Sequence, residues 1–269
     1  MAELANTALL MPDELPAVEV YRPSASSPLL IHCDHGGNAV PRGLNDLGLS
    51  PDVLSRHVGW DIGAAAVARQ LAVNLDATAV IARYSRLVID LNRALGDNDA
   101  FPAMSDGIAI PGNAALTQGD LNARADHLFW PYHKALDSEL ARIKAQQKIP
   151  VMFSVHSFTP ALMESKRSQP RPWHCGVMFS RDTRFGDHLI AALRGVPGMA
   201  VGVNEPYSGV THGYCMKMHG LAQGMPHAQI EIRQDLICSE AGQAWWGGLL
   251  SCLIAPILGQ SNLAEIRHF

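Results

Sequence analysis

The chain has 269 residues, a hydrophobic fraction of 48% and a formal net charge of −4 at pH 7. A chain of this length can bury a large core, and we expect one domain that spans residues 1–269. Nucleic-acid binding needs a basic surface, and this acidic balance without a Lys/Arg block argues against it.

The cysteines and the apolar segments indicate in which cellular compartment the protein is expected. The five cysteines are widely spaced and form no CxxC pair, which argues against a disulfide framework. Residues 1–16 lack the basic start of a signal peptide, and no apolar run reaches the roughly 20 residues of a membrane span. We therefore expect a soluble, cytoplasmic protein without a membrane partner. Its oligomeric state is not indicated.

Short apolar runs alternate with helical patterns from the start of the chain. Leu29–Cys33 is an apolar run that leads into a Gly-rich turn, which predicts a buried strand. Ser50 and Pro51 suit the N-cap and first position of a helix, and helical spacing continues to about Asn74 with a break near Gly59. Further strands are predicted at 77–83 and 87–89.

The middle of the chain begins with a long polar loop, 94–116, of a length that is commonly functional. Thr117 and Asp120 resemble a capping box and open an amphipathic helix to about Gln147, which Pro131 is expected to kink. The remaining predicted elements are strands at 151–155, 176–180, 200–204 and 228–232 and helices at 187–193 and 240–258.

This alternation predicts an α/β fold with three layers, in which a mostly parallel mixed sheet carries helices on both faces. In such sheets ligands bind beyond the carboxyl ends of the strands. Polar residues that follow strands are therefore the candidates for a site.

Two histidines, His35 and His156, directly follow apolar strands and are the natural metal ligands. Catalytic zinc usually takes three protein ligands and leaves one position for water. The third ligand could be Asp61, Asn38 or Asp34, although a neutral amide is a poor zinc ligand. Other divalent ions also suit two imidazoles and a carboxylate. The alternative is that both histidines are hydrogen-bonded structural residues.

Glu231 alternates with apolar residues in a predicted strand, so it shares a face with Gln229 and Arg233. A carboxylate inside a buried strand is costly unless it is paired or used. The pattern leaves two interpretations open: an ion pair with Arg233, or a base that takes a proton from a metal-bound water.

Arg86 and Arg93 flank the segment that ends in Asp90–Arg93. A guanidinium binds carboxylates bidentately and can stabilise a developing oxyanion, so two arginines near a metal suit an acidic substrate. One of them is expected to pair with Asp90 instead. His212 is a candidate for lining the pocket, and His133 for a packing or supporting role.

Six segments occur in a recognisable order. They are Asp34–Pro41 (DHGGNAVP), His57–Gly63 (HVGWDIG), Ser85–Arg93 (SRLVIDLNR), Pro131–His133 (PYH), His156–Pro160 (HSFTP) and Ala228–Arg233 (AQIEIR). Their order and spacing, across roughly residues 29–250, resemble the N-formylglutamate amidohydrolase family. The resemblance implies a fold similar to the zinc carboxypeptidases and to the aspartoacylase and succinylglutamate desuccinylase group.

The resemblance also implies roles for particular residues. His35 and His156 fall where the two zinc histidines are expected, and Glu231 matches the catalytic glutamate. Asn92 and Arg93 would hold the substrate carboxylate. Asn38 departs from the glutamate of the wider group.

We complete this set with further expectations. By the same resemblance, Arg86 would face the reacting centre. Asp61 would be the third metal ligand, and Arg233 and His212 would join the substrate-binding residues. The expected reaction is zinc-dependent cleavage of the amide bond of an N-acylated acidic amino acid, with N-formylglutamate as the model substrate. The alternatives are a zinc carboxypeptidase-like enzyme acting on small peptides and a non-catalytic binder of acidic small molecules.

Overall fold

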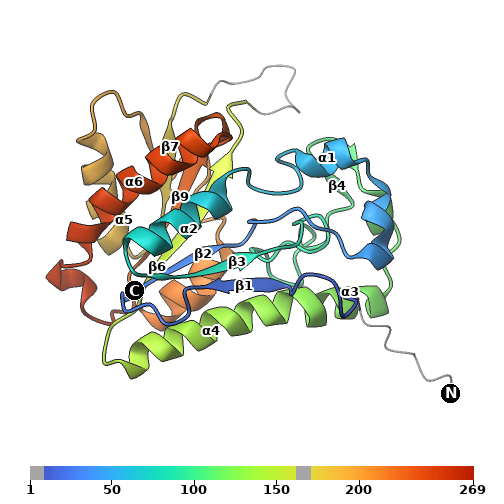
Figure 1. Cartoon of the computed structure of the whole chain (residues 1–269), viewed down its shortest axis with the longest axis horizontal. Coiled ribbons are helices and arrows are strands. Elements are labelled where there is room, and N and C mark those ends of the chain that lie inside the picture. The colour runs from blue at the N-terminus through green and yellow to red at the C-terminus, as the bar shows by residue number, and fades with distance from the viewer. Residues whose placement is uncertain (1–8, 162–170) are drawn as a thin grey trace.

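The computed structural model describes residues 9–161 and 171–269. Within these residues seven strands form one sheet in the order β1–β3–β2–β6–β9–β7–β8 (Figure 1). The strands are β1 (Val18–Tyr21), β2 (Leu29–Cys33), β3 (Thr78–Ala82), β6 (Val151–Phe158), β7 (Cys175–Met178), β8 (Val201–Val203) and β9 (His227–Arg233). β3, β2, β6 and β9 run parallel, whereas β1 is antiparallel to β3 and β7 is antiparallel to β9.

Helices cover both faces of this sheet, which confirms the predicted three-layer α/β architecture (Figure 1). α2, α5 and α6 pack on one face and α4 packs on the other. The helices are α1 (Pro51–Ser55), α2 (Ala64–Asn74), α3 (Gln118–Arg124), α4 (Trp130–Ala145), α5 (Arg184–Arg194) and α6 (Glu240–Ile257). Over the described part of the chain, none of the helices is long and apolar enough for a bilayer crossing.

Strand β2 shows how the sequence builds the two cores. Leu29 and Ile31 pack with the layer of α2, α5 and α6, while Leu30 packs with the layer of α4. Successive side chains of a strand point to opposite faces, so a strand covered on both sides needs apolar residues throughout. The apolar run Leu29–Cys33 therefore predicted this strand with its correct bounds.

The helix starts predicted at Ser50 and Thr117 are confirmed, whereas the helix predicted at 187–193 begins earlier, at Arg184. The Ser50 hydroxyl accepts a hydrogen bond from the Val53 amide at 3.4 Å, and the expected break separates α1 from α2. The Thr117–Asp120 capping box makes both of its bonds. A π-helical turn then precedes Pro131, which cannot donate a backbone hydrogen bond and therefore favours an irregular turn at this point.

The predicted strand at 87–89 is wrong. Leu87 and Val88 are buried, but their carbonyls accept hydrogen bonds from side chains: Asn113 Nδ2 donates to the first at 2.8 Å and Arg124 Nη1 to the second at 2.9 Å. Side chains thus satisfy backbone groups that a neighbouring strand would otherwise pair. The edge strand β1 was not predicted. The 94–116 loop contains a short hairpin, β4 (Met104–Ser105) and β5 (Ile108–Ala109).

Candidate active site

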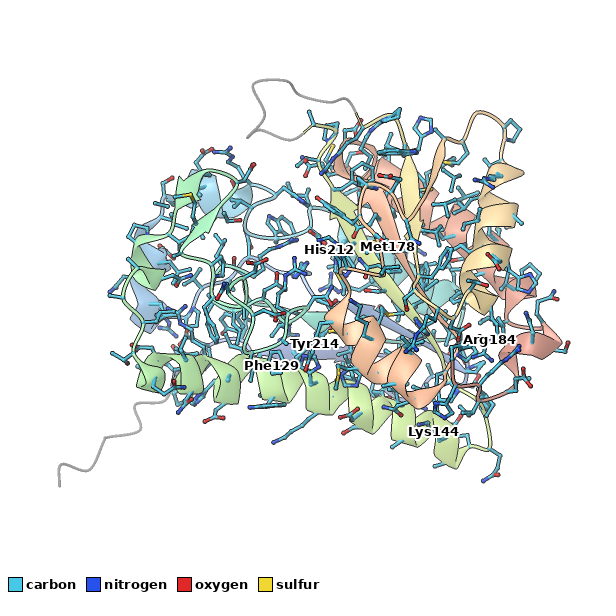
Figure 2. All side chains as sticks on the ribbon, turned by 180° about the vertical axis from the view of Figure 1, so that it is seen from behind. Phe129, Lys144, Met178, Arg184, His212 and Tyr214 are labelled. Carbon is cyan, nitrogen blue, oxygen red and sulfur yellow. The ribbon has the colours of Figure 1, made fainter. Side chains whose placement is uncertain are left out.

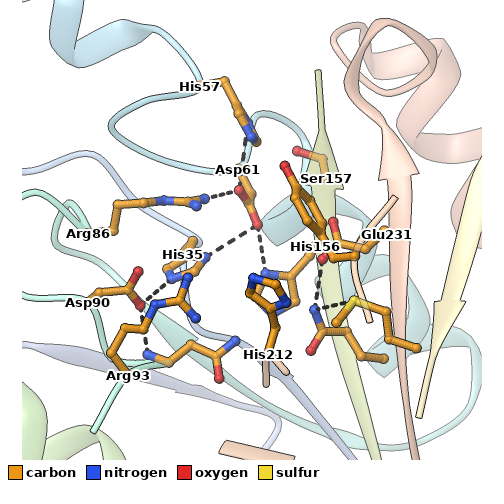
Figure 3. A pocket seen from close by; sticks show the side chains of 14 residues that line it. His35, His57, Asp61, Arg86, Asp90, Arg93, His156, Ser157, His212 and Glu231 are labelled. Carbon is orange, nitrogen blue, oxygen red and sulfur yellow. Dashed lines mark hydrogen bonds and ion pairs between the residues drawn. The ribbon is translucent and has the colours of Figure 1, made fainter. Parts of the chain in front are cut away.

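A pocket of about 150 Å³ lies beyond the carboxyl ends of β2, β6 and β9 (Figure 3). This is the edge of the sheet where the strand-end rule predicts a site. The residues that line it are His35, His57, Asp61, Arg86, Asp90, Asn92, Arg93, His156, Ser157, Met178, Tyr207, His212, Gln229 and Glu231.

Strand register brings distant segments together in this pocket. The parallel pairing of β6 with β9 sets His156 directly beside Glu231. β2 pairs with the other edge of β6, so the turn that carries His35 emerges next to them. The Asp61 amide donates to the His35 carbonyl at 2.9 Å, which ties the loop before α2 to this turn.

His35, Asp61 and His156 each bring a ligand atom to within 4.8 Å of the others, and all three residues are buried. Asp61 Oδ2 lies 2.8 Å from His156 Nδ1 and 3.6 Å from His35 Nδ1 (Figure 3). His35 Nδ1 has no hydrogen-bond partner among the described residues. An unpartnered buried nitrogen that faces a carboxylate and a second imidazole suits a divalent cation. The set could therefore hold zinc, or another ion with similar preferences.

The far nitrogen of each imidazole meets a further carboxylate. His35 Nε2 lies 2.7 Å from Asp90 Oδ1, and His156 Nε2 lies 3.2 Å from Asp34 Oδ2. Carboxylates in this position fix the tautomer and orientation of metal-binding histidines. Burial opposes ionisation of Asp90, but the neighbouring His35 and Arg86 lower its pKa to about 2. It is therefore available as an ionised acceptor.

The structure separates the three candidates for the third metal ligand. Asn38 is turned away, and its side-chain amide donates to the Leu54 carbonyl at 3.3 Å. Asp34 lies behind His156, 2.8 Å from His32 Nδ1, and accepts a hydrogen bond from the Tyr132 hydroxyl. Of the three, Asp61 is the one that groups with both histidines.

Arg86 lines the pocket and forms an ion pair with Asp61. The expected partner, Asp90, is engaged by His35 instead. Although burial opposes it, Arg86 and the nearby histidines hold the pKa of Asp61 well below its usual range. Asp61 is thus an anion at the centre of the group.

Glu231 is 4% exposed and faces the pocket from β9 (Figure 3). Its Oε1 accepts a hydrogen bond from Gln229 Nε2 at 2.8 Å, while Oε2 has no partner in the described residues. Burial raises the pKa of Glu231 to about 7, with His156 opposing the shift. A carboxyl group with an unpartnered oxygen and such a pKa suits proton transfer near neutral pH.

Arg233 does not line the pocket. Its guanidinium binds the Asp235 carboxylate at 2.8 Å, so the ion pair with Glu231 is also absent. Strand alternation gave Arg233 the same side as Glu231, but Arg233 is the last residue of β9 and the following turn supplies its partner. We therefore leave Arg233 out of the substrate-binding set.

Asn92, Arg93 and His212 do line the pocket. The Asn92 amide donates to Asp90 Oδ1 at 2.8 Å, and its side-chain carbonyl accepts from the Cys215 amide at 3.0 Å. The charged contact of Arg93 is a distant one, 3.9 Å from the exposed Asp99. Its guanidinium therefore remains available to an anion in the pocket (Figure 3).

Tyr207 also lines the pocket, and sequence reasoning missed it. Its place depends on Gly176, which pairs with Glu231 across β7 and β9. A Cβ atom on Gly176 would overlap the Glu205 carbonyl oxygen, so glycine lets the backbone that leads to Tyr207 lie against the sheet. His57 and Ser157 were quoted as parts of motifs but given no role, although both line the pocket.

Residues 27–238 match the sequence pattern of the N-formylglutamate amidohydrolase family. The chain belongs to this family. An N-formylglutamate deformylase of Pseudomonas aeruginosa is 26% identical over 252 residues, which cover 88% of this chain and 87% of that protein. Membership in the N-formylglutamate amidohydrolase family supports hydrolase activity on an amide.

Two solved structures are similar in fold to this chain. A gene product of Agrobacterium tumefaciens is 35% identical with a TM-score of 0.87, over 96% of this chain and 100% of that chain. An N-formylglutamate amidohydrolase from Ralstonia eutropha has a TM-score of 0.68 at 22% identity, over 91% of this chain and 97% of that chain. The second likeness supports the fold alone.

Proposed function

We propose that this chain is a metal-dependent hydrolase that cleaves the formyl amide of an N-formylated acidic amino acid such as N-formylglutamate. The observation that carries the proposal is the His35–Asp61–His156 group with Glu231 beside it in strand register. The N-formylglutamate amidohydrolase family and the related deformylase of Pseudomonas aeruginosa support the same substrate class.

The metal would be held by His35 Nδ1, His156 Nδ1 and the Asp61 carboxylate. The unpartnered state of His35 Nδ1 and the mixed nitrogen and oxygen donors support this assignment, with zinc as the first candidate. When bound, the cation supplies Lewis acidity toward the formyl oxygen and makes a water more acidic.

Glu231 is the proposed proton carrier. Its Oε2 accepts a proton from the attacking water and delivers it to the amide nitrogen as the carbon–nitrogen bond breaks, which yields formate and a free amine. Arg86, half-buried beside Asp61, stabilises the negative charge that develops on the carbonyl oxygen.

Arg93 and Asn92 are the proposed contacts to the substrate carboxylate, and His212 lines the same side of the pocket. They would align the amide before it reacts. The pocket, at about 150 Å³, is smaller than the roughly 300–1,000 Å³ of common ligand sites. That size favours a small formyl amino acid over a peptide, and a simple binder would not need the three-ligand group.

The test of this proposal is the variant Glu231→Gln, which keeps the shape of the side chain but removes its base. We expect the turnover number for N-formylglutamate, measured by formate release, to fall by about 10²–10⁴-fold. Metal content, measured on the same preparation, should be unchanged at about one ion per chain. Glu240→Gln, at the exposed start of α6, is the matched control. Near-normal turnover in Glu231→Gln would remove Glu231 from the mechanism.

The substrate class is tested by the ratio kcat/KM. N-formylglutamate and N-formylaspartate should exceed N-formyl derivatives of neutral amino acids, and short peptides should be the poorest substrates. A preference for peptides would favour the carboxypeptidase-like alternative.

A further inference from the structure

A second pair of histidines lies behind the Asp90–Arg93 segment and has no part in the proposed reaction. His133 comes from α4 and His219 from a π-helical turn, and each is 6% exposed. His133 Nδ1 lies 2.7 Å from His219 Nε2, and His133 Nε2 lies 3.1 Å from the Leu91 carbonyl oxygen. His219 Nδ1 is 2.9 Å from Asp137 Oδ1. The result is a chain of contacts that ends on the segment carrying Asn92 and Arg93.

These contacts assign the protons of His133. A carbonyl can only accept, so His133 Nε2 carries the hydrogen that it donates to Leu91. Burial lowers the pKa of His133 to about 4, so the ring is neutral near pH 7 and its Nδ1 has a lone pair. His219 Nε2 must then be the donor to that lone pair. The two rings are 19° from parallel with centroids 5.1 Å apart, so the short nitrogen contact runs nearly within both ring planes, as a ring lone pair requires.

The contact between His219 and Asp137 is the outer link of the chain. His219 makes this bond together with the bond to His133 only when both of its nitrogens carry protons. The Asp137 side chain is 59% exposed, so it can turn to solvent when His219 is neutral. The inner bonds, from His219 to His133 and from His133 to Leu91, are satisfied in either case.

Leu91 is held from two sides. Besides the bond from His133, its carbonyl lies 3.3 Å from Cys215 Sγ, and the Cys215 amide donates to the side chain of Asn92. His133 itself packs against two aromatic rings, with centroid distances of 4.1 Å to Phe129 and 5.7 Å to Tyr214. These two rings lie near each other, 6.1 Å apart between centroids (Figure 2). The imidazole is therefore fixed in place, and its proton position decides whether it supports or repels the Leu91 carbonyl.

We propose that His219, by donating to Nδ1, holds His133 in the orientation in which its Nε2–H binds the Leu91 carbonyl, and that His133 thereby sets how Asn92 and Arg93 face the pocket. Both histidines are positioning residues, since neither lines the pocket. The consequence for substrate binding rests on the proposed function, because it assumes that Asn92 and Arg93 bind the substrate carboxylate.

The first experiment reads the tautomer directly. In the full-length wild-type protein at pH 7, ¹⁵N NMR of the histidine rings should show His133 protonated at Nε2 and unprotonated at Nδ1. His219→Gln keeps a side-chain N–H donor to Nδ1, whereas His219→Leu removes it and should shift the ¹⁵N resonance of the unprotonated Nδ1. A wild-type His133 protonated at Nδ1 would overturn the inference, and this result needs no folded variant.

The second experiment reads the effect on substrate. His219→Leu should raise the KM for N-formylglutamate about tenfold, the size of one lost buried hydrogen bond, and leave kcat within about twofold. His219→Gln should restore KM, and His188→Leu on α5 is the matched control. An N-formyl amide without a carboxylate should be unaffected by either change at position 219. Equal impairment in the Leu and Gln variants, or a loss in kcat alone, would contradict the positioning role.

The two experiments separate two kinds of failure. If the wild-type protein releases no formate from any N-formyl amino acid, the proposed function fails, while the NMR measurement still decides the His133 tautomer. If the wild-type protein is active but His133 is protonated at Nδ1, the inference fails and the proposed function stands.

Discussion

Each imidazole of the candidate metal group turns one ring nitrogen toward Asp61 and the other toward a supporting acid. Asp90 supports His35 and Asp34 supports His156. A carboxylate in this position raises the basicity of a metal-binding histidine and holds its orientation. Sequence reasoning treated Asp34 as a possible ligand and Asp90 as a partner of an arginine, so these supporting roles follow from the structure.

The variant Asp90→Asn tests the support of His35. It keeps an acceptor for the imidazole but removes the negative charge, so we expect zinc affinity to fall by about tenfold, at the lower end of such effects. Affinity can be measured by competition with a chelator. Asp106→Asn is the control, because Asp106 is exposed in the β4–β5 turn at a positive φ that Asn also adopts. Unchanged affinity in Asp90→Asn would show that the contact is not needed.

At the scale of elements, the sequence predicted the strands that are buried on both faces, because such strands need a continuous apolar run. The apolar runs at Leu29–Cys33 and in β6 are covered on both faces, and the residues that follow or end them, His35 and His156, could be selected from that pattern. The run at 87–89 has the same composition but is not a strand, because Asn113 and Arg124 bind its carbonyls. The partners of such carbonyls lie far along the chain and leave no local signal.

The same reason explains which site residues were predicted. Glu231 belongs to a strand, and its neighbour His156 follows from the strand register. Tyr207 reaches the pocket through a loop whose path depends on Gly176. Arg233 lies outside the pocket because its guanidinium binds Asp235. Positions on regular elements could be inferred from the sequence, whereas the approach of loops and the competition between partners could not.

The start of α3 provides a stability prediction at this scale. Thr117→Ala removes the hydroxyl that accepts from the Asp120 amide, so the free energy of unfolding should fall by about 1 kcal/mol. Urea denaturation measures this change. Thr117→Ser keeps the hydroxyl and should recover most of the loss. Indistinguishable midpoints for the Ala and Ser variants would mean that the cap contributes little in the folded chain.

At the scale of the whole molecule, the candidate metal group joins segments that lie far apart in the sequence. His35 lies in the turn after β2, Asp61 lies in the loop before α2, and His156 lies on β6. A cation bound here would connect these segments in the folded state, where the three ligand atoms already converge.

Metal should therefore stabilise the folded protein. At a free zinc concentration about 100 times the dissociation constant, linkage predicts a gain of about 2.7 kcal/mol in the free energy of unfolding. Thermal or urea unfolding with and without zinc measures it, after the metal has been stripped. His35→Asn should lose this gain, and His188→Asn should retain it. An equal gain in His35→Asn would place the stabilising ion elsewhere.

Gly176, which carries no side chain, sets the width of the pocket on the side of Tyr207. Because the Glu205 backbone rests where a methyl group would stand, any larger residue at 176 must push that backbone outward, and Tyr207 with it. The space next to Glu231 would then grow on the side of β7, while the metal ligands on β6 and the turns beyond β2 stayed where they are. We therefore expect a single aliphatic carbon at position 176 to change the room beside Glu231 without altering a charged side chain.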